Sequence, residues 1–106
     1  LIWFEQPVTA FLFDTYLGGA DPHPYAVPAA GVLARLPPTL VTTSALDALE
    51  DQAVRYVELL AAAGVETEHH QAEDLLHGYL NLVGTVPAAD AILQRHITWI
   101  DERINA

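Results

Sequence analysis

Residues 36–51 form the stretch LPPTLVTTSALDALED. It opens with two prolines, and the next residues, 39–43, are rich in β-branched side chains, which favour a short buried strand. Asp47 follows, with Glu50 three residues later, and this spacing is typical of a helix N-cap with a capping box. An apolar stripe then runs to Gly64, where a helix is expected to stop. The stretch therefore predicts a strand followed directly by a helix.

Two further elements complete this pattern. Residues 65–71 predict a second strand with polar side chains on both faces, as in an edge strand. Residues 87–104 predict a last helix, because Pro87 fits a first helical turn. The apolar face of that helix is formed by Leu93, Ile97, Ile100 and Ile104. A strand, a helix and a strand of these lengths form a βαβ unit with parallel strands. The fold class is therefore α/β, a βαβα arrangement.

Upstream of this unit the sequence predicts one helix and one long connection. Residues 8–17 are expected to be helical and to end at Gly18, because glycine suits the left-handed conformation that closes a helix. Residues 21–38 contain five prolines and predict an ordered but irregular connection. A chain of 106 residues is short for an α/β domain and contains no methionine, so we expect residues 1–106 to be the C-terminal segment of one larger domain.

The composition excludes several classes of partner. Fourteen acidic residues against four basic ones give a formal charge of −10, which repels nucleic acids and anionic membrane surfaces. No apolar run approaches the roughly 18 residues of a membrane span. The absence of cysteine excludes disulfides and thiolate metal sites, and it is compatible with a reducing compartment. A cytoplasmic protein without nucleic-acid partners or membrane spans is expected.

Asp47 and His77 are the candidate catalytic residues. Asp47 follows the first predicted strand and His77 follows the second. Parallel strands end at the same edge of a sheet, and neighbouring strands lie about 4.8 Å apart, so a carboxylate and an imidazole can meet there. Open α/β sheets place their active sites at this edge. An aspartate that orients a histidine, which in turn moves a proton, is the arrangement of a hydrolase triad.

The chain also carries a series of short motifs in a fixed order. They read YLGGADP at 16–22, LPP at 36–38, DALED at 47–51, AGV at 63–65 and LLHGY at 75–79. Together they resemble the C-terminal third of the hormone-sensitive-lipase-like carboxylesterases, a branch of the α/β-hydrolases. The resemblance implies an esterase or lipase that cleaves small acyl esters without a cofactor. It also implies that Asp47 is the triad acid and His77 the triad base.

The sequence departs from that family at several positions. Ala48 replaces a proline, Gln52 a glutamate and Tyr79 a phenylalanine, and Ala72-Glu73-Asp74 replaces Tyr-Pro-Gly. The Gly-x-Ser-x-Gly elbow and the HGGG-type loop that such hydrolases need are absent from residues 1–106, and Ser44, the only serine, has no flanking glycine. We therefore expect the nucleophile to lie outside these residues, and the 106-residue chain alone to hydrolyse nothing.

Other interpretations remain open from the sequence. Asp before a helix is usually only a cap, and the protein is then a non-catalytic relative or binding module. A metal-binding module would use His69, His70, Glu73, Asp74 and His77. Against it, adjacent histidines on a strand point to opposite faces. His96 is expected to be structural and His23 to lie on the surface. The family often dimerises through its last strand, so residues 65–71 are a candidate edge for a homodimer.

Overall fold

The computed structural model describes residues 6–106, which form three α-helices, a pair of strands and three short 3-10 helices. In chain order these are α1 (Gln6–Leu17), η1 (Pro28–Ala30), η2 (Leu33–Arg35), β1 (Thr39–Ser44), α2 (Glu50–Ala62), β2 (Thr67–Ala72), η3 (Tyr79–Leu82) and α3 (Pro87–Ile104). The predicted α/β order is therefore confirmed. The connection before β1 is irregular, as expected, apart from η1 and η2.

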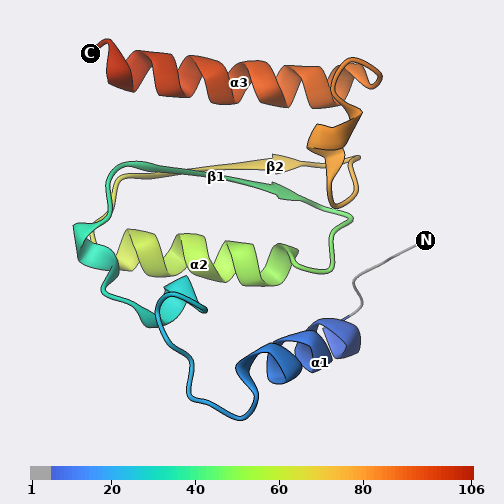
Figure 1. Ribbon diagram of the computed structural model, residues 1–106. Helices are drawn as coiled ribbons and strands as arrows, with labels where there is room; N and C mark the ends of the chain where they lie inside the picture. Colours follow the sequence, from blue (N-terminus) through green and yellow to red (C-terminus); the bar gives the residue numbers. More distant parts are fainter. Residues whose placement is uncertain (1–5) are drawn as a thin grey trace.

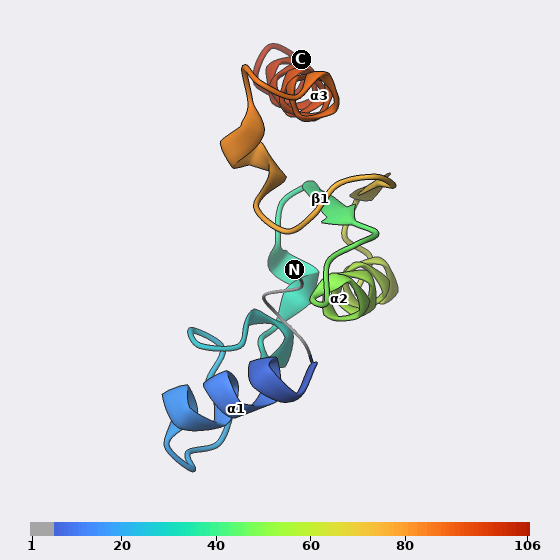
Figure 2. The same ribbon diagram turned by 90° about the vertical axis from the view of Figure 1, so that its right-hand side faces the viewer.

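The two strands form a parallel sheet with helices on both faces. The register runs from Thr39 opposite Thr67 to Ser44 opposite Ala72. Figure 1 shows α2 below the sheet and α3 above it, and Figure 2 shows the same layers from the side. Alternate side chains point to opposite faces of a strand, so β1 presents Thr43 towards α2 and Thr42 towards α3. The predicted βαβα unit with parallel strands is confirmed.

Helix α2 begins later than the capping pattern predicts. Its first residue is Glu50, and Leu49 occupies the N-cap without a side-chain hydrogen bond. The expected capping role of Asp47 is therefore wrong. The Asp47 carboxylate instead accepts a hydrogen bond from the backbone N–H of Leu49 at 2.9 Å, which closes a turn ahead of the helix. Strand β2 also begins two residues later than expected, at Thr67.

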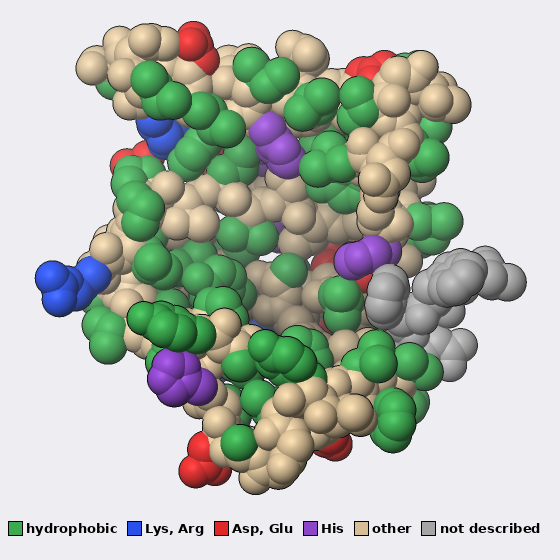
Figure 3. Space-filling view, in the orientation of Figure 1, with side chains coloured by type: hydrophobic (Ala, Val, Ile, Leu, Met, Phe, Trp, Pro, Cys, Tyr) green, Lys and Arg blue, Asp and Glu red, His purple; other side chains and the backbone are tan. Residues whose placement is uncertain are grey.

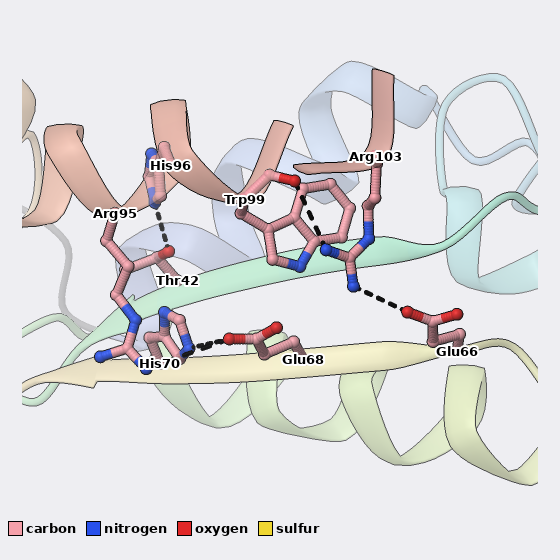
Figure 4. A network of polar contacts seen from close by, with 8 residues as sticks. All are labelled: Thr42, Glu66, Glu68, His70, Arg95, His96, Trp99 and Arg103. Atoms are coloured by element: carbon pink, nitrogen blue, oxygen red, sulfur yellow. Dashed lines mark hydrogen bonds and ion pairs between the residues drawn. The ribbon is translucent and has the colours of Figure 1, made fainter. Parts of the chain in front are cut away.

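Helix α3 packs on the sheet through polar and aromatic side chains (Figure 4). A hydrogen bond of 2.6 Å joins His96 Nε2 to Thr42 Oγ1. Arg103 donates to Glu66 Oε1 at 2.7 Å and stacks over the Trp99 ring at 3.7 Å. His96, Trp99 and Arg103 are spaced by three and four positions and therefore lie on one face of α3. This face contacts the polar side chains on the upper side of the sheet.

Three residues of the apolar stripe on α3 are exposed. Ile97 and Ile100 are each 49% exposed, and Ile104 is 75% exposed. Figure 3 shows hydrophobic side chains spread over one face of the molecule, from α3 to α1. The sequence predicted the stripe but not which side of α3 meets the sheet. The structure places His96 and Arg103 against the strands, and Ile100 lines a depression shared with Leu40 and Thr42 of β1.

The surroundings of His96 predict that the stability of the fold depends on pH. Burial, together with the neighbouring His70, lowers the pKa of His96 below its ordinary value of 6.5. The unfolded chain then binds the proton more readily. The contribution of His96 to stability is therefore fully present above its unfolded pKa of 6.5 and is lost as the pH falls from there through the lower pKa of the folded state. Glu68 and Arg95 also lie in this network, 3.9 Å apart.

We expect the free energy of unfolding in denaturant to fall between about pH 7.5 and pH 5.5, with a slope from His96 of at most about 1.4 kcal/mol per pH unit. The variant His96→Gln should show a flatter profile than the wild type. His23→Gln is the matched control, because His23 is exposed. An identical slope in wild type and His96→Gln would remove His96 as the cause.

Candidate active site

Asp47 lies three residues beyond the end of β1, in a turn that fixes its side chain. Its backbone N–H donates to the carbonyl of Ser44 at 3.0 Å, and its own carbonyl accepts from the N–H of Glu50 at 3.0 Å. With Oδ1 bound to Leu49 N, the carboxylate has one oxygen held by the backbone. The Asp47 side chain is only 14% exposed. The turn therefore holds the carboxylate in place and shields most of it from bulk water.

His77 lies in the loop that follows β2, and the structure brings it to Asp47. Its Nδ1 is 2.7 Å from Asp47 Oδ2, so the two residues predicted from the sequence form a hydrogen bond across the ends of both strands. Gly78 follows with φ of 79°, a left-handed conformation that glycine adopts without strain and that turns the chain into η3. The His77 side chain is 47% exposed, so its ring is open to solvent and to an incoming group.

The pair lies beside an open depression of about 300 Å³ at the carboxyl end of β1. Its lining includes Asp47, His77, Thr42, Leu49, Tyr79 and Leu80. Tyr79 is 9% exposed, and burial, reinforced by the charge of Asp47, raises the pKa of its phenol. The Tyr79 hydroxyl therefore stays protonated at neutral pH and can donate a hydrogen bond.

The apolar residues around His77, which are candidates for a substrate pocket, divide between core and surface. Leu75 and Tyr79 are buried with Ala72 in one hydrophobic cluster, against which Val86 and Ile92 pack. Leu76 and Leu82 are 50% and 42% exposed. Among these candidates Tyr79 lines the depression, whereas Leu75 anchors the loop below His77.

A polar network on the α2 side of the sheet was not predicted from the sequence. Thr43, which is 4% exposed, donates to Glu50 Oε1 at 3.2 Å and lies 2.9 Å from His69 Nε2. Gln71 Nε2 donates to the same carboxylate oxygen. These contacts link β1, β2 and the first turn of α2 directly beneath the Asp47 turn. The signal that was available is Glu50, which was assigned to a capping box but lies opposite Thr43 instead.

The histidines do not gather into one group. His69 faces Thr43 on the α2 side of the sheet, whereas His70 contacts Glu68 on the α3 side at 2.5 Å. The histidine side chains visible in Figure 3 are well separated from one another. Within residues 6–106, no three His, Cys, Asp or Glu side chains are grouped so that they could hold a metal ion. In the same range, no helix is long and apolar enough to cross a membrane.

Several known proteins are similar to this chain in sequence. A family model described as alpha/beta hydrolase fold matches residues 2–81. Esterase LipI of Mycobacterium tuberculosis is 45% identical over 84 residues, which cover 76% of this chain and 26% of that protein. Carboxylesterase NlhH of the same species is 36% identical over 74 residues, which cover 70% of this chain and 23% of that protein.

A solved esterase structure is also similar to this chain. The crystal structure of esterase LipW from Mycobacterium marinum superposes with a TM-score of 0.73 and 32% sequence identity, over 85% of this chain and 29% of that one. The chain thus spans less than a third of the length of the relatives it matches.

Proposed function

The chain belongs to the α/β-hydrolase fold family, in its hormone-sensitive-lipase-like branch, and from this premise we propose that it supplies the acid and the base of a serine carboxylesterase. Asp47 is the acid and His77 is the base. Residues 1–106 are then the C-terminal segment of one hydrolase domain, and a segment outside them supplies the serine nucleophile and the oxyanion hole. The single observation that carries the proposal is the 2.7 Å contact between Asp47 Oδ2 and His77 Nδ1.

The proton chemistry follows from which imidazole nitrogen Asp47 holds. A carboxylate on Nδ1 stabilises the tautomer with the proton on Nδ1, so Nε2 is the basic nitrogen. Nε2 accepts the proton of the serine hydroxyl as its oxygen attacks the ester carbonyl carbon. The resulting imidazolium is stabilised by Asp47, which keeps its own negative charge.

The rest of the cycle uses the same two residues. The tetrahedral intermediate collapses, the ester C–O bond breaks, and His77 gives its proton to the departing alcohol. Water then attacks the acyl-enzyme while Nε2 takes one of its protons. The carboxylic acid leaves as the serine recovers a proton from His77. Each proton removed is returned, so one ester and one water give one acid and one alcohol.

The substrate class proposed is a small acyl ester of short to medium chain length. Two features support it: the relatives are named esterase or carboxylesterase, and the depression beside the pair is small and partly apolar. A lipase-like preference for longer chains, a cytoplasmic location and a homodimer formed through the outer edge of β2 belong to the same proposal. A non-catalytic relative that retains Asp47 and His77 is the alternative, favoured by the altered Ala72-Glu73-Asp74 segment.

The test compares two proteins from the same gene on p-nitrophenyl acetate and p-nitrophenyl hexanoate. We expect the full-length protein to turn over both esters and the 106-residue chain to give no rate above the uncatalysed one, because it holds the base without the nucleophile. Hydrolysis by the 106-residue chain would contradict the division of the triad. A full-length protein that is folded but inactive on a panel of such esters would favour the non-catalytic alternative.

A further inference from the structure

Ser44 connects the two segments that carry Asp47 and His77. It is the last residue of β1 and is 2% exposed. Its backbone carbonyl accepts the hydrogen bond from Asp47 N at 3.0 Å. Its side-chain hydroxyl donates to the backbone carbonyl of Leu75. Ser44 is therefore bonded both to Asp47 itself and to Leu75, which lies two residues before His77.

Two side-chain hydrogen bonds join the segment after β2 to β1: that of the Ser44 hydroxyl with Leu75 and that between Tyr79 and Thr42. The strand pairing ends with a hydrogen bond of 3.0 Å from Ala45 N to Ala72 O. Glu73 and Asp74 then form an exposed turn that leads away from the sheet, and Leu75 brings the chain back. The Leu75 side chain is buried at 8% exposure, which fixes the depth of the loop, while the Ser44 hydroxyl fixes the Leu75 backbone.

Removing this hydroxyl would act on the loop and not on the strand. A buried carbonyl that loses its donor carries an unfavourable free energy of about 1–3 kcal/mol unless it moves to another donor or to water. The Leu75 carbonyl can reach water only if the loop shifts outwards. His77 is two residues away on the same loop, so the shift would lengthen the contact between Nδ1 and Asp47 Oδ2.

We propose that Ser44 is a positioning residue, which sets the distance between Asp47 and His77 by bonding the Asp47 turn and the Leu75 backbone at the same time. This inference rests on the proposed function for its effect on turnover. Ser44 is not the nucleophile, because its hydroxyl is buried and directed at the Leu75 carbonyl. Its contribution is to the geometry of the pair.

The experiment measures turnover and the state of His77 in the full-length protein. The variant Ser44→Ala should lower kcat by about 10-fold to 100-fold, since small displacements of a catalytic group have effects of this size, with KM changed by less than about threefold. In proton NMR of histidine-labelled protein, the low-field resonance of His77 Nδ1–H should shift upfield or broaden. Ser44→Thr, which keeps the hydroxyl, should restore both kcat and the resonance.

Two further variants separate positioning from general stability. Thr67→Val removes a hydroxyl that donates to the Val65 carbonyl at 2.9 Å, at the opposite end of the sheet, and should leave kcat and the resonance unchanged. Ser44→Cys keeps a donor at the same position, but the S–H group is larger and donates weakly, so kcat should lie between those of wild type and Ser44→Ala. If Ser44→Ala fails to fold, this graded variant carries the test.

The outcomes are distinct. A lower kcat in Ser44→Ala with an unchanged His77 resonance would overturn the proposal, because the loss would then be general. Unchanged kcat and an unchanged resonance would also overturn it. If the wild type turns over no ester, the proposed carboxylesterase function fails, but a His77 resonance that moves in Ser44→Ala and returns in Ser44→Thr would still establish the positioning role.

Discussion

Replacing His77 with alanine is expected to lower kcat of the full-length protein by about 10⁴-fold or more, with little change in KM. In the proposed mechanism the imidazole takes the proton from the nucleophile and returns it to the alcohol. Alanine leaves Asp47 Oδ2 without its partner at 2.7 Å and leaves the serine hydroxyl at its unactivated pKa. The measurement is steady-state hydrolysis of p-nitrophenyl acetate over a range of substrate concentrations.

The control for this variant is His23→Ala. His23 is exposed in the connection before β1 and accepts a hydrogen bond from Tyr25 N at 3.2 Å, far along the chain from the candidate pair. It should keep the wild-type kcat, and both variants should give circular dichroism spectra of folded protein. Wild-type turnover by His77→Ala would remove His77 from the role of base.

Replacing Asp47 with asparagine is expected to lower kcat by about 10⁴-fold while the fold persists. Oδ1 accepts from Leu49 N, so the amide oxygen of asparagine will keep that position and the amide N–H₂ will face His77 Nδ1. A donor at that point forces Nδ1 to accept, which moves the imidazole proton to Nε2. The nitrogen that should take the serine proton then already carries one.

Asp51→Asn is the matched control, because it makes the same change in charge four residues later, on an exposed position of the first turn of α2. It should leave kcat within about twofold of wild type. Equal losses in Asp47→Asn and Asp51→Asn would show that general electrostatics, and not the tautomer of His77, governs the rate.

Local sequence patterns predicted the elements but not which side chains bond between them. The β-branched run before Ser44 and the Pro87 start of α3 are local signals, and both elements appear where they were expected. The capping box at Asp47 was wrong for a non-local reason. Its carboxylate has one oxygen bonded to Leu49 N and the other to His77, 30 residues away, so the helix begins without it.

Helix α3 shows the same limit on a larger scale. Its isoleucines mark an apolar stripe, and periodicity alone selects that stripe as the buried face. The sheet beneath presents Thr42 and His70, polar groups that contact His96 and Glu68 respectively. Which face of a helix is buried depends on the surface it meets, and that surface is assembled from two strands.

The two central residues of the candidate site were predicted from the sequence, but the contacts that hold them in place were not. Strand geometry made Asp47 and His77 a possible pair, and the resemblance of their motifs to the esterase family selected them. The structure brings them within hydrogen-bond distance. The residues that hold them could not be chosen. The bond from the Ser44 hydroxyl to the Leu75 carbonyl and the network of Thr43, Glu50 and His69 depend on the path of loops that no short motif encodes.

The most direct test of the proposed triad is covalent labelling of the full-length protein with a fluorophosphonate, followed by peptide mass spectrometry. Phosphonylation displaces fluoride from phosphorus and needs a serine hydroxyl whose proton is taken by a base. We expect one adduct, on a serine outside residues 1–106. It should form about 10³-fold more slowly, or not at all, in His77→Ala and Asp47→Asn. An adduct on Ser44, or labelling at the wild-type rate in both variants, would contradict the proposed triad.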